Sequence, residues 1–208
     1  MPRIIPNLWF DTQAEEAAEF YVSVFPNSRV VEVSRYTEAG PGPAGSVMVV
    51  DFELDGQPFT AINGGPQFPF TEAVSLLVEC ADQAEIDHYW DALTAGGEEV
   101  QCGWLKDRFG FSWQVCPAGM GEVLNDPDPE RARRAVEAMF GMKKLDVAAL
   151  RRRNSRWHFV GPLPNRRRGW CQTPGRADRG PLTLRPPPAR TRPHRRPGRR
   201  RHGPHLVG

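Results

Sequence analysis

Apolar and polar residues alternate most regularly near the middle of the chain. Residues 100–105 and 111–115 are rich in Trp, Phe and Val, and they flank a short polar connection that ends at Gly110. Glycine takes positive φ without steric cost, so Gly110 favours a tight turn. In the second run, alternation places Phe111, Trp113 and Val115 on one side and Ser112, Gln114 and Cys116 on the other. The pattern predicts a β-hairpin with one buried apolar face and one mixed polar face, which either lines a cavity or faces solvent.

A strand, a capped helix and further strands are predicted twice along the chain. In the first half, strands are expected at residues 4–10, 29–37, 46–54 and 59–63, with a helix from residue 14 to residue 25. In the second half, a strand at 73–80 precedes a helix whose apolar face spans 86–93, and the hairpin follows. Thr12 and Glu15 are spaced as a capping box that starts the first helix, and Asp82 and Glu85 are spaced in the same way before the second.

This repeated order indicates an internal duplication. It predicts an α+β fold of two tandem βαβββ modules, about residues 2–66 and 70–120, that form a curled mixed sheet with helices outside. Asp128 suits an N-cap and Pro129 the first helical position, so a terminal helix is expected over residues 128–141. Asp146 is expected to cap a shorter helix that ends near Leu150.

Charge divides the chain into two parts. Residues 1–150 carry 10 basic and 24 acidic residues, a formal net charge of −14, whereas residues 151–208 carry 17 Arg, no Lys and one acid. The second part also has 10 Pro and 7 Gly without periodicity, and such a segment does not bury enough apolar surface to fold. We predict a disordered tail at 151–208, interpreted as a frameshift-like extension. The rival interpretation is an arginine-rich arm that binds nucleic acid through phosphate contacts, although RGG repeats and an RNP signature are missing.

Cysteine usage and hydropathy favour a cytoplasmic location. The first apolar run is short and contains Pro6, so a secretory signal is not expected, and no run approaches the roughly 18 apolar residues of a membrane span. Cys80, Cys102, Cys116 and Cys171 form no C-x-x-C pair. Reduced thiols are therefore predicted instead of a disulfide framework.

Short motifs within the two modules are shared with a known family. They are LWFD (8–11), AEEA (14–17), FPNS (25–28), INGG (62–65), IDHYW (86–90), GWLKD (103–107) and GFSW (110–113). With the duplicated βαβββ order, the sequence resembles the PhnB-like branch of the vicinal oxygen chelate superfamily, the glyoxalase/bleomycin-resistance fold. That branch often carries the label 3-demethylubiquinone-9 3-methyltransferase domain. The resemblance covers about residues 2–150 and implies one domain over 1–150.

The resemblance implies that each module curls into a half-cup, and that superfamily enzymes hold a divalent metal there on the first and last strands. The corresponding positions are Asn7 or Trp9, Asn63, Ser75 and Gln114. The chain departs from the pattern, because its one histidine before residue 150, His88, lies on a predicted helix. Amides and a serine hydroxyl are weak ligands for the usual metals. We therefore predict no cofactor and no metal ligand, with a divalent metal kept as the alternative.

The cup residues instead suit a small neutral or aromatic ligand. The predicted lining is Asn7, Trp9, Asn63, Ser75, Trp104 and Gln114; alternatively, these are buried polar groups satisfied by neighbouring backbone. No catalytic residue is assigned. His88 is expected to face solvent and the thiols of Cys102 and Cys116 to be inert. Lys106 and Asp107 are expected to be turn residues.

The predicted function is a small-molecule binding protein, or an enzyme of unknown substrate, that works as a homodimer. The missing histidine ligands favour a binding module without catalysis over a metal-dependent lyase or dioxygenase-type enzyme. Methyltransferase activity is not expected, since a G-x-G-x-x-G loop is absent and βαβββ modules do not form the doubly wound sheet that binds such cofactors. No membrane partner is predicted, and nucleic-acid binding is kept only as the function of a genuine tail.

Overall fold

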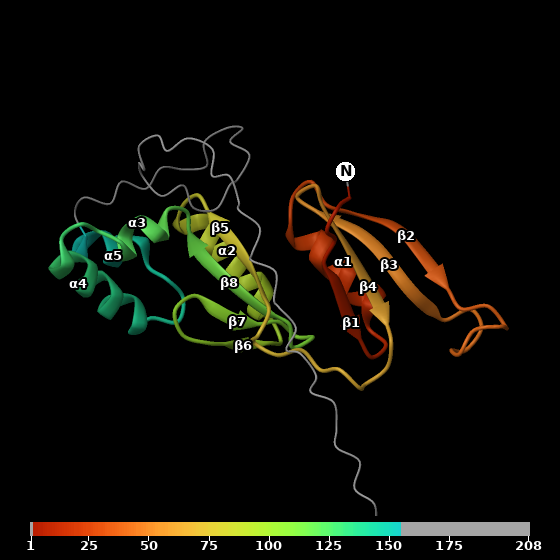
Figure 1. Ribbon diagram of the computed structural model, residues 1–208. Helices are drawn as coiled ribbons and strands as arrows, with labels where there is room; N and C mark the ends of the chain where they lie inside the picture. Colours follow the sequence, from red (N-terminus) through yellow and green to blue (C-terminus); the bar gives the residue numbers. More distant parts are fainter. Residues whose placement is uncertain (1, 155–208) are drawn as a thin grey trace, which may run out of the picture. The chain divides into compact units, whose positions relative to one another are not determined.

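The computed structural model describes residues 2–154, which form two βαβββ modules followed by short helices (Figure 1). The first module contains β1 (Asn7–Phe10), α1 (Ala14–Val24), β2 (Arg29–Arg35), β3 (Val47–Leu54) and β4 (Gln57–Asn63). The second contains β5 (Ser75–Cys80), α2 (Gln83–Thr94), β6 (Glu98–Glu99), β7 (Trp104–Lys106) and β8 (Ser112–Pro117). The helices that follow are α3 (Met120–Leu124), α4 (Pro129–Phe140) and α5 (Val147–Arg153). The predicted α+β fold of tandem modules is confirmed.

The two modules have the same strand topology. The strand orders are β1-β4-β3-β2 and β5-β8-β7-β6, and in each sheet the first strand runs parallel to the last. The remaining neighbours are antiparallel. Shared topology supports the internal duplication inferred from the sequence. Each module contributes one four-stranded mixed sheet, as expected, and neither sheet closes.

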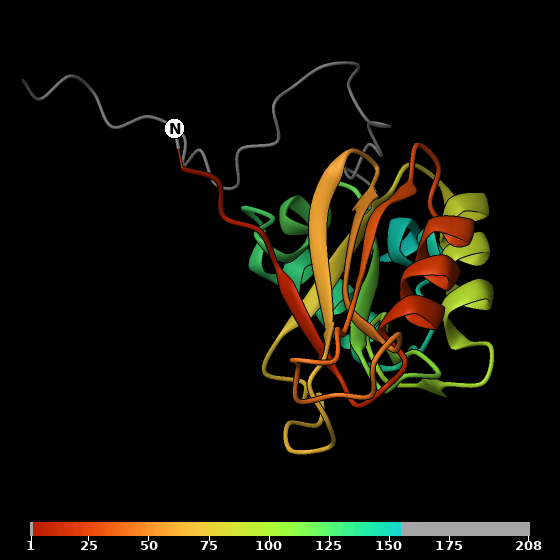
Figure 2. The ribbon, with the colours of Figure 1, turned by 90° about the vertical axis from the view of Figure 1, so that its right-hand side faces the viewer.

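The core includes one face of each sheet and the helix that covers it. Helices α1 and α2 lie side by side (Figures 1 and 2), and aromatic rings join the two modules there. Phe25, next to the end of α1, stacks on Trp113 of β8 and on Tyr89 of α2, with ring centroids 5.4 and 5.1 Å apart. Trp113 is only 2% exposed, which confirms the predicted buried face of the hairpin.

The first strand of the hairpin is shorter than predicted. β7 begins at Trp104, and the expected strand at 100–103 is wrong. Cys102 and Gly103 have φ of 62° and 81°, outside the β region. Their N–H groups donate to the carbonyls of Met142 and Lys143, so the segment after α4 supplies the partners that a strand would otherwise provide.

The predicted helix caps are confirmed with one exception. Asp82, Asp128 and Asp146 accept backbone N–H bonds at the starts of α2, α4 and α5, as expected. The capping box at Thr12 is wrong, because α1 starts after Gln13 without a local side-chain cap. The Ala14 N–H instead donates to Oδ1 of Asn63, 49 residues further along the chain, at 2.8 Å.

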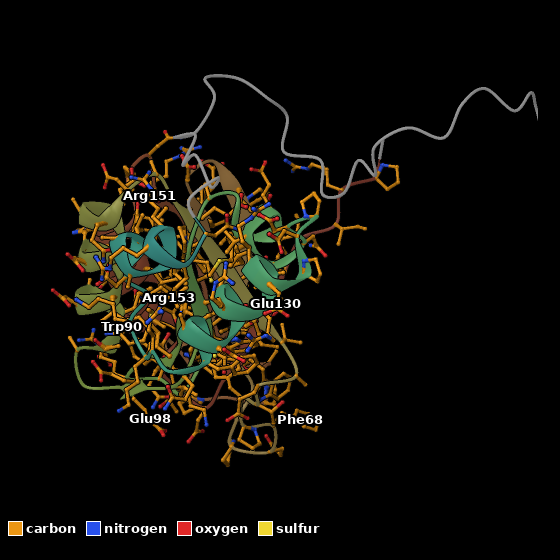
Figure 3. All side chains as sticks on the ribbon, turned by 90° about the vertical axis from the view of Figure 1, so that its left-hand side faces the viewer. Phe68, Trp90, Glu98, Glu130, Arg151 and Arg153 are labelled. Atoms are coloured by element: carbon orange, nitrogen blue, oxygen red, sulfur yellow. The ribbon has the colours of Figure 1, made fainter. Side chains whose placement is uncertain are left out.

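Helices α4 and α5 lie against one another beside the second module (Figure 3). Ala135 of α4 is buried, while Phe140 at its end is 64% exposed. α5 continues through Arg153 and ends at the buried Asn154. The predicted tail beyond that point, with its frameshift interpretation, lies outside the described residues. Within residues 2–154, no helix has both the length and the apolar character needed to cross a bilayer.

Candidate ligand-binding site

Alternation along β1 turns two predicted site residues away from the core. Leu8 and Phe10 are buried, whereas Asn7 and Trp9 point to the opposite face of sheet β1-β4-β3-β2. Asn7 is exposed. The half-buried Trp9 donates its indole N–H to the Gly65 carbonyl at 2.8 Å, and a Cβ on Gly64 would overlap its ring. Trp9 therefore fixes the glycine turn after β4 as well as lining this face.

Asn63 points to the other face of the same sheet. It pairs in register with the buried Phe10. Its Oδ1 accepts the Ala14 N–H at 2.8 Å, and its Nδ2 donates to the Val47 carbonyl at 3.1 Å. These are the contacts of a polar group satisfied by backbone, which was the alternative to a ligand-binding role.

Sheet β5-β8-β7-β6 brings the other three predicted residues together. Trp104 pairs with Gln114 across β7 and β8, and Gln114 donates from Nε2 to Ser75 Oγ at 2.9 Å. All three are half-buried and lie on the face opposite the buried Trp113. We call this set, Ser75, Trp104 and Gln114, the polar face of the second module. An aromatic surface beside a hydroxyl and an amide can hold a small polar molecule by stacking and hydrogen bonding.

A second row of side chains continues the polar face. Ser112 of β8 pairs with Lys106 of β7 on one side and with Ser75 of β5 on the other. Lys106 Nζ forms an ion pair with Glu72 Oε1 at 2.5 Å. That hydrogen bond raises the pKa of Lys106 and lowers the pKa of Glu72. The charges of this row are therefore matched to each other.

The side chains that could hold a metal are dispersed, and the thiols that could act as nucleophiles are protonated. Among residues 2–154, no three or more His, Cys, Asp or Glu side chains are arranged to hold a metal ion. Burial raises the pKa of Cys80 and of Cys116 to about 12, and it also raises the pKa of Cys102. His88 is exposed on α2, as expected, with Nε2 3.3 Å from the Val24 carbonyl oxygen.

Asp107 is the buried polar residue whose role the sequence did not reveal. It does form the predicted turn, and its Oδ1 accepts the N–H groups of Phe109 and Phe111 at 2.9 and 3.0 Å. Its Oδ2 also accepts the Tyr21 hydroxyl and the Trp113 indole N–H, each at 2.8 Å. The residue is 2% exposed, and burial raises its pKa although all four donors oppose that shift. The D-x-x-G spacing signalled the turn, but nothing local signalled burial.

An open cavity of about 490 Å³ lies where β1 ends and α1 begins. Its lining includes Asp11, Glu15 and Tyr36 together with the backbone of Gly64. Glu15 is paired with Arg35 at 3.0 Å, and the Tyr36 hydroxyl donates to the Asn63 carbonyl at 3.3 Å. Thr12 and Asn63, which the sequence analysis singled out for a helix cap and for the ligand site, also line this cavity.

Two βαβββ modules of equal topology define the glyoxalase/bleomycin-resistance class that the motifs resemble. The family model described as 3-demethylubiquinone-9 3-methyltransferase matches residues 2–116. The match spans more than half of the chain, and the chain belongs to this family.

Three solved structures are similar to part of this chain. A PhnB protein from Bacillus cereus is 39% identical, with a TM-score of 0.53, over 56% of this chain and 100% of that chain. A protein from Pseudomonas aeruginosa is 22% identical, with a TM-score of 0.48, over 56% of this chain and 98% of that one. The fosfomycin resistance protein FosX from Listeria monocytogenes is 15% identical, with a TM-score of 0.42, over 60% and 97% of the two chains. Comparison with curated proteins gave no match.

Proposed function

We propose that this chain is a small-molecule binding protein of the glyoxalase-like class, with the polar face of the second module as its ligand site. The observation that carries the proposal is the grouping of Ser75, Trp104 and Gln114 on one half-buried strand face. Asn7 and Trp9 provide a second, smaller face in the first module. Asn63 is left out of the site because both ends of its amide are already bonded.

The donor chemistry of these faces does not fit the divalent metal that the superfamily resemblance implies. These faces offer hydroxyls, amides and protonated thiols, together with the carboxylates of Glu72, which Lys106 holds, and Asp51, which accepts the Thr60 hydroxyl. Among residues 2–154 no three His, Cys, Asp or Glu side chains are grouped to hold a metal ion, and hydroxyls and amides carry no charge to offset the loss of metal hydration. The methyltransferase activity in the family description is likewise not proposed, because neither sheet has the doubly wound topology of adenosyl-cofactor enzymes.

A homodimer in the cytoplasm is part of the proposal. Each polar face lies on an open sheet, and a second copy placed over it would enclose a ligand. Cys80, Cys102 and Cys116 are free thiols, which suits a reducing compartment.

The test is release of bound molecules from full-length protein purified under native conditions. We expect denaturation to release an organic molecule in near-stoichiometric amount from the wild type and several-fold less from Trp104→Ala. Phe140→Ala, an exposed aromatic residue at the end of α4 and outside both faces, is the control. Elemental analysis of the same samples should find no stoichiometric divalent metal. Stoichiometric metal without an organic ligand would favour the metalloenzyme instead.

A further inference from the structure

Ser112 has an unsatisfied hydroxyl in the interior of the second module. Its Oγ is the one buried side-chain oxygen or nitrogen without a hydrogen-bond partner in the part of the chain that the structure describes. The residue is only 1% exposed. Buried polar side-chain atoms nearly always have a partner, so an orphan of this kind marks a place where a further group is expected.

The neighbours of Ser112 already have partners of their own. Ser75 on β5 receives the Gln114 amide, and Lys106 on β7 is held by Glu72. Strand pairing places Ser112 between these two residues. Ser112 is therefore the member of this row whose side chain has no hydrogen-bond partner.

We propose that Ser112 anchors the polar end of an uncharged ligand whose flat apolar part lies on Trp104. This rests on the proposed function and narrows its ligand class. Trp104 and Gln114 occupy the next row of the same face, within the reach of a single-ring molecule. A charged end would be disfavoured, because Lys106 and Glu72 neutralise each other beside the hydroxyl.

Access to the hydroxyl requires a neighbouring side chain to move. Lys106 is the residue best suited to do so, since its ammonium is held by Glu72 in a partly exposed ion pair, with side chains 31% and 60% exposed. Surface ion pairs contribute little to stability. Movement of the lysine side chain would open the row between β7 and β5.

The experiment uses four probes with one ring and different polar ends: benzyl alcohol, benzamide, benzoate and benzylamine. Each is titrated into the full-length protein while the NMR signals of the Gln114 side-chain amide and the Trp104 indole are followed. We expect the two neutral probes to shift both signals and the two charged probes to bind at least about tenfold more weakly. Ser112→Ala should weaken the neutral probes about tenfold, the loss of one well-formed hydrogen bond.

Thermal unfolding separates this role from a structural one. Loss of an unpaired buried hydroxyl should leave the Tm of Ser112→Ala unchanged or raise it by about 2–4 °C. Ser34→Ala, in β2 of the other sheet, is the matched control and should leave probe binding unchanged.

Three results would overturn the inference. If the neutral probes shifted the NMR signals equally in the wild type and in Ser112→Ala, Ser112 would not be the anchor. The proposed function would be unaffected by that result. If no probe shifted the NMR signals of the wild type, the proposed ligand class would be wrong. The proposed function would then be tested by the Trp104→Ala release experiment alone. A Tm lowered by several degrees in Ser112→Ala would show that the hydroxyl has a structural partner, such as an ordered water.

Discussion

The Tyr21 hydroxyl donates a 2.8 Å hydrogen bond to Oδ2 of Asp107, joining α1 of the first module to the β7–β8 turn of the second. Both residues are buried and 86 positions apart in the chain. Burial, followed by the charge of Asp107, raises the pKa of Tyr21 well above its ordinary value. This contact ties the two duplicated halves together through a polar group.

Tyr21→Phe should therefore destabilise the protein. The substitution removes one donor from a buried carboxylate and keeps the ring packing, so we expect a loss of about 1–3 kcal/mol in the free energy of unfolding. Denaturant titration measures it. Tyr89→Phe, on α2, is the control and should change the value by less than about 0.5 kcal/mol. Equal losses in both variants would show that the bond to Asp107 contributes nothing specific.

Trp113 should be the most costly aromatic residue of the hairpin. Trp113→Ala removes a buried indole and a donor to Asp107, and we expect a loss of about 3–5 kcal/mol by the same titration. Trp104→Ala, on the half-exposed face of the neighbouring strand, should cost clearly less. A loss below about 1 kcal/mol for Trp113→Ala would contradict its placement in the core.

Stability should depend on pH through Asp107. Burial raises the pKa of this carboxyl in the folded chain, so the folded protein keeps a proton that the unfolded chain has lost. Its contribution is complete below the unfolded pKa of about 3.9 and is lost as pH rises through the folded pKa. The free energy of unfolding of the wild type minus that of Asp107→Asn should therefore fall as pH rises from about 3 to 7.

Asp126 provides a control whose contribution to stability should change with pH in the opposite direction. Its hydrogen bond to Arg131 lowers its pKa to about 2. The contribution of Asp126 is present above the unfolded pKa and disappears as pH falls toward 2, so the difference between wild type and Asp126→Asn should grow with pH. If the Asp107→Asn difference also grew with pH, the four donors would outweigh burial.

Asn63→Ala should destabilise the start of α1. The variant loses the acceptor for the Ala14 N–H and the bond to Val47, and we expect a cost of about 1–2 kcal/mol in denaturant titration. Thr12→Ala tests the discarded local cap and should stay within about 0.5 kcal/mol. If Thr12→Ala lowered the free energy of unfolding more than Asn63→Ala did, the local capping box would be the correct interpretation.

The full-length chain should be a dimer in solution. Light scattering at micromolar concentration should give twice the chain mass of 23.3 kDa. We expect a truncation after Asn154 to keep this doubled mass, because the proposed interface involves the modules alone. A monomeric mass for both proteins would contradict the homodimer.

Sequence patterns predicted the features that depend on neighbouring residues. Asp82 and Asp128 start helices through bonds to amides within three residues, and Trp113 follows the two-residue period of a strand. The features that were missed depend on distant partners. Asn63 caps a helix 49 positions away, and the turn at Cys102 is held by residue 142. The burial of Asp107 likewise requires α1 of the other module, which no local pattern contains.

The tie between Tyr21 and Asp107 has a consequence for how the chain unfolds. If the first half unfolded alone, the Asp107 carboxylate would lose the Tyr21 hydroxyl and keep three of its four donors. Phe25 would at the same time leave Trp113 uncovered. Such a partly open state is costly, so neither half is expected to persist as an independent folding unit. Although the two halves share one topology, they should melt in a single cooperative transition.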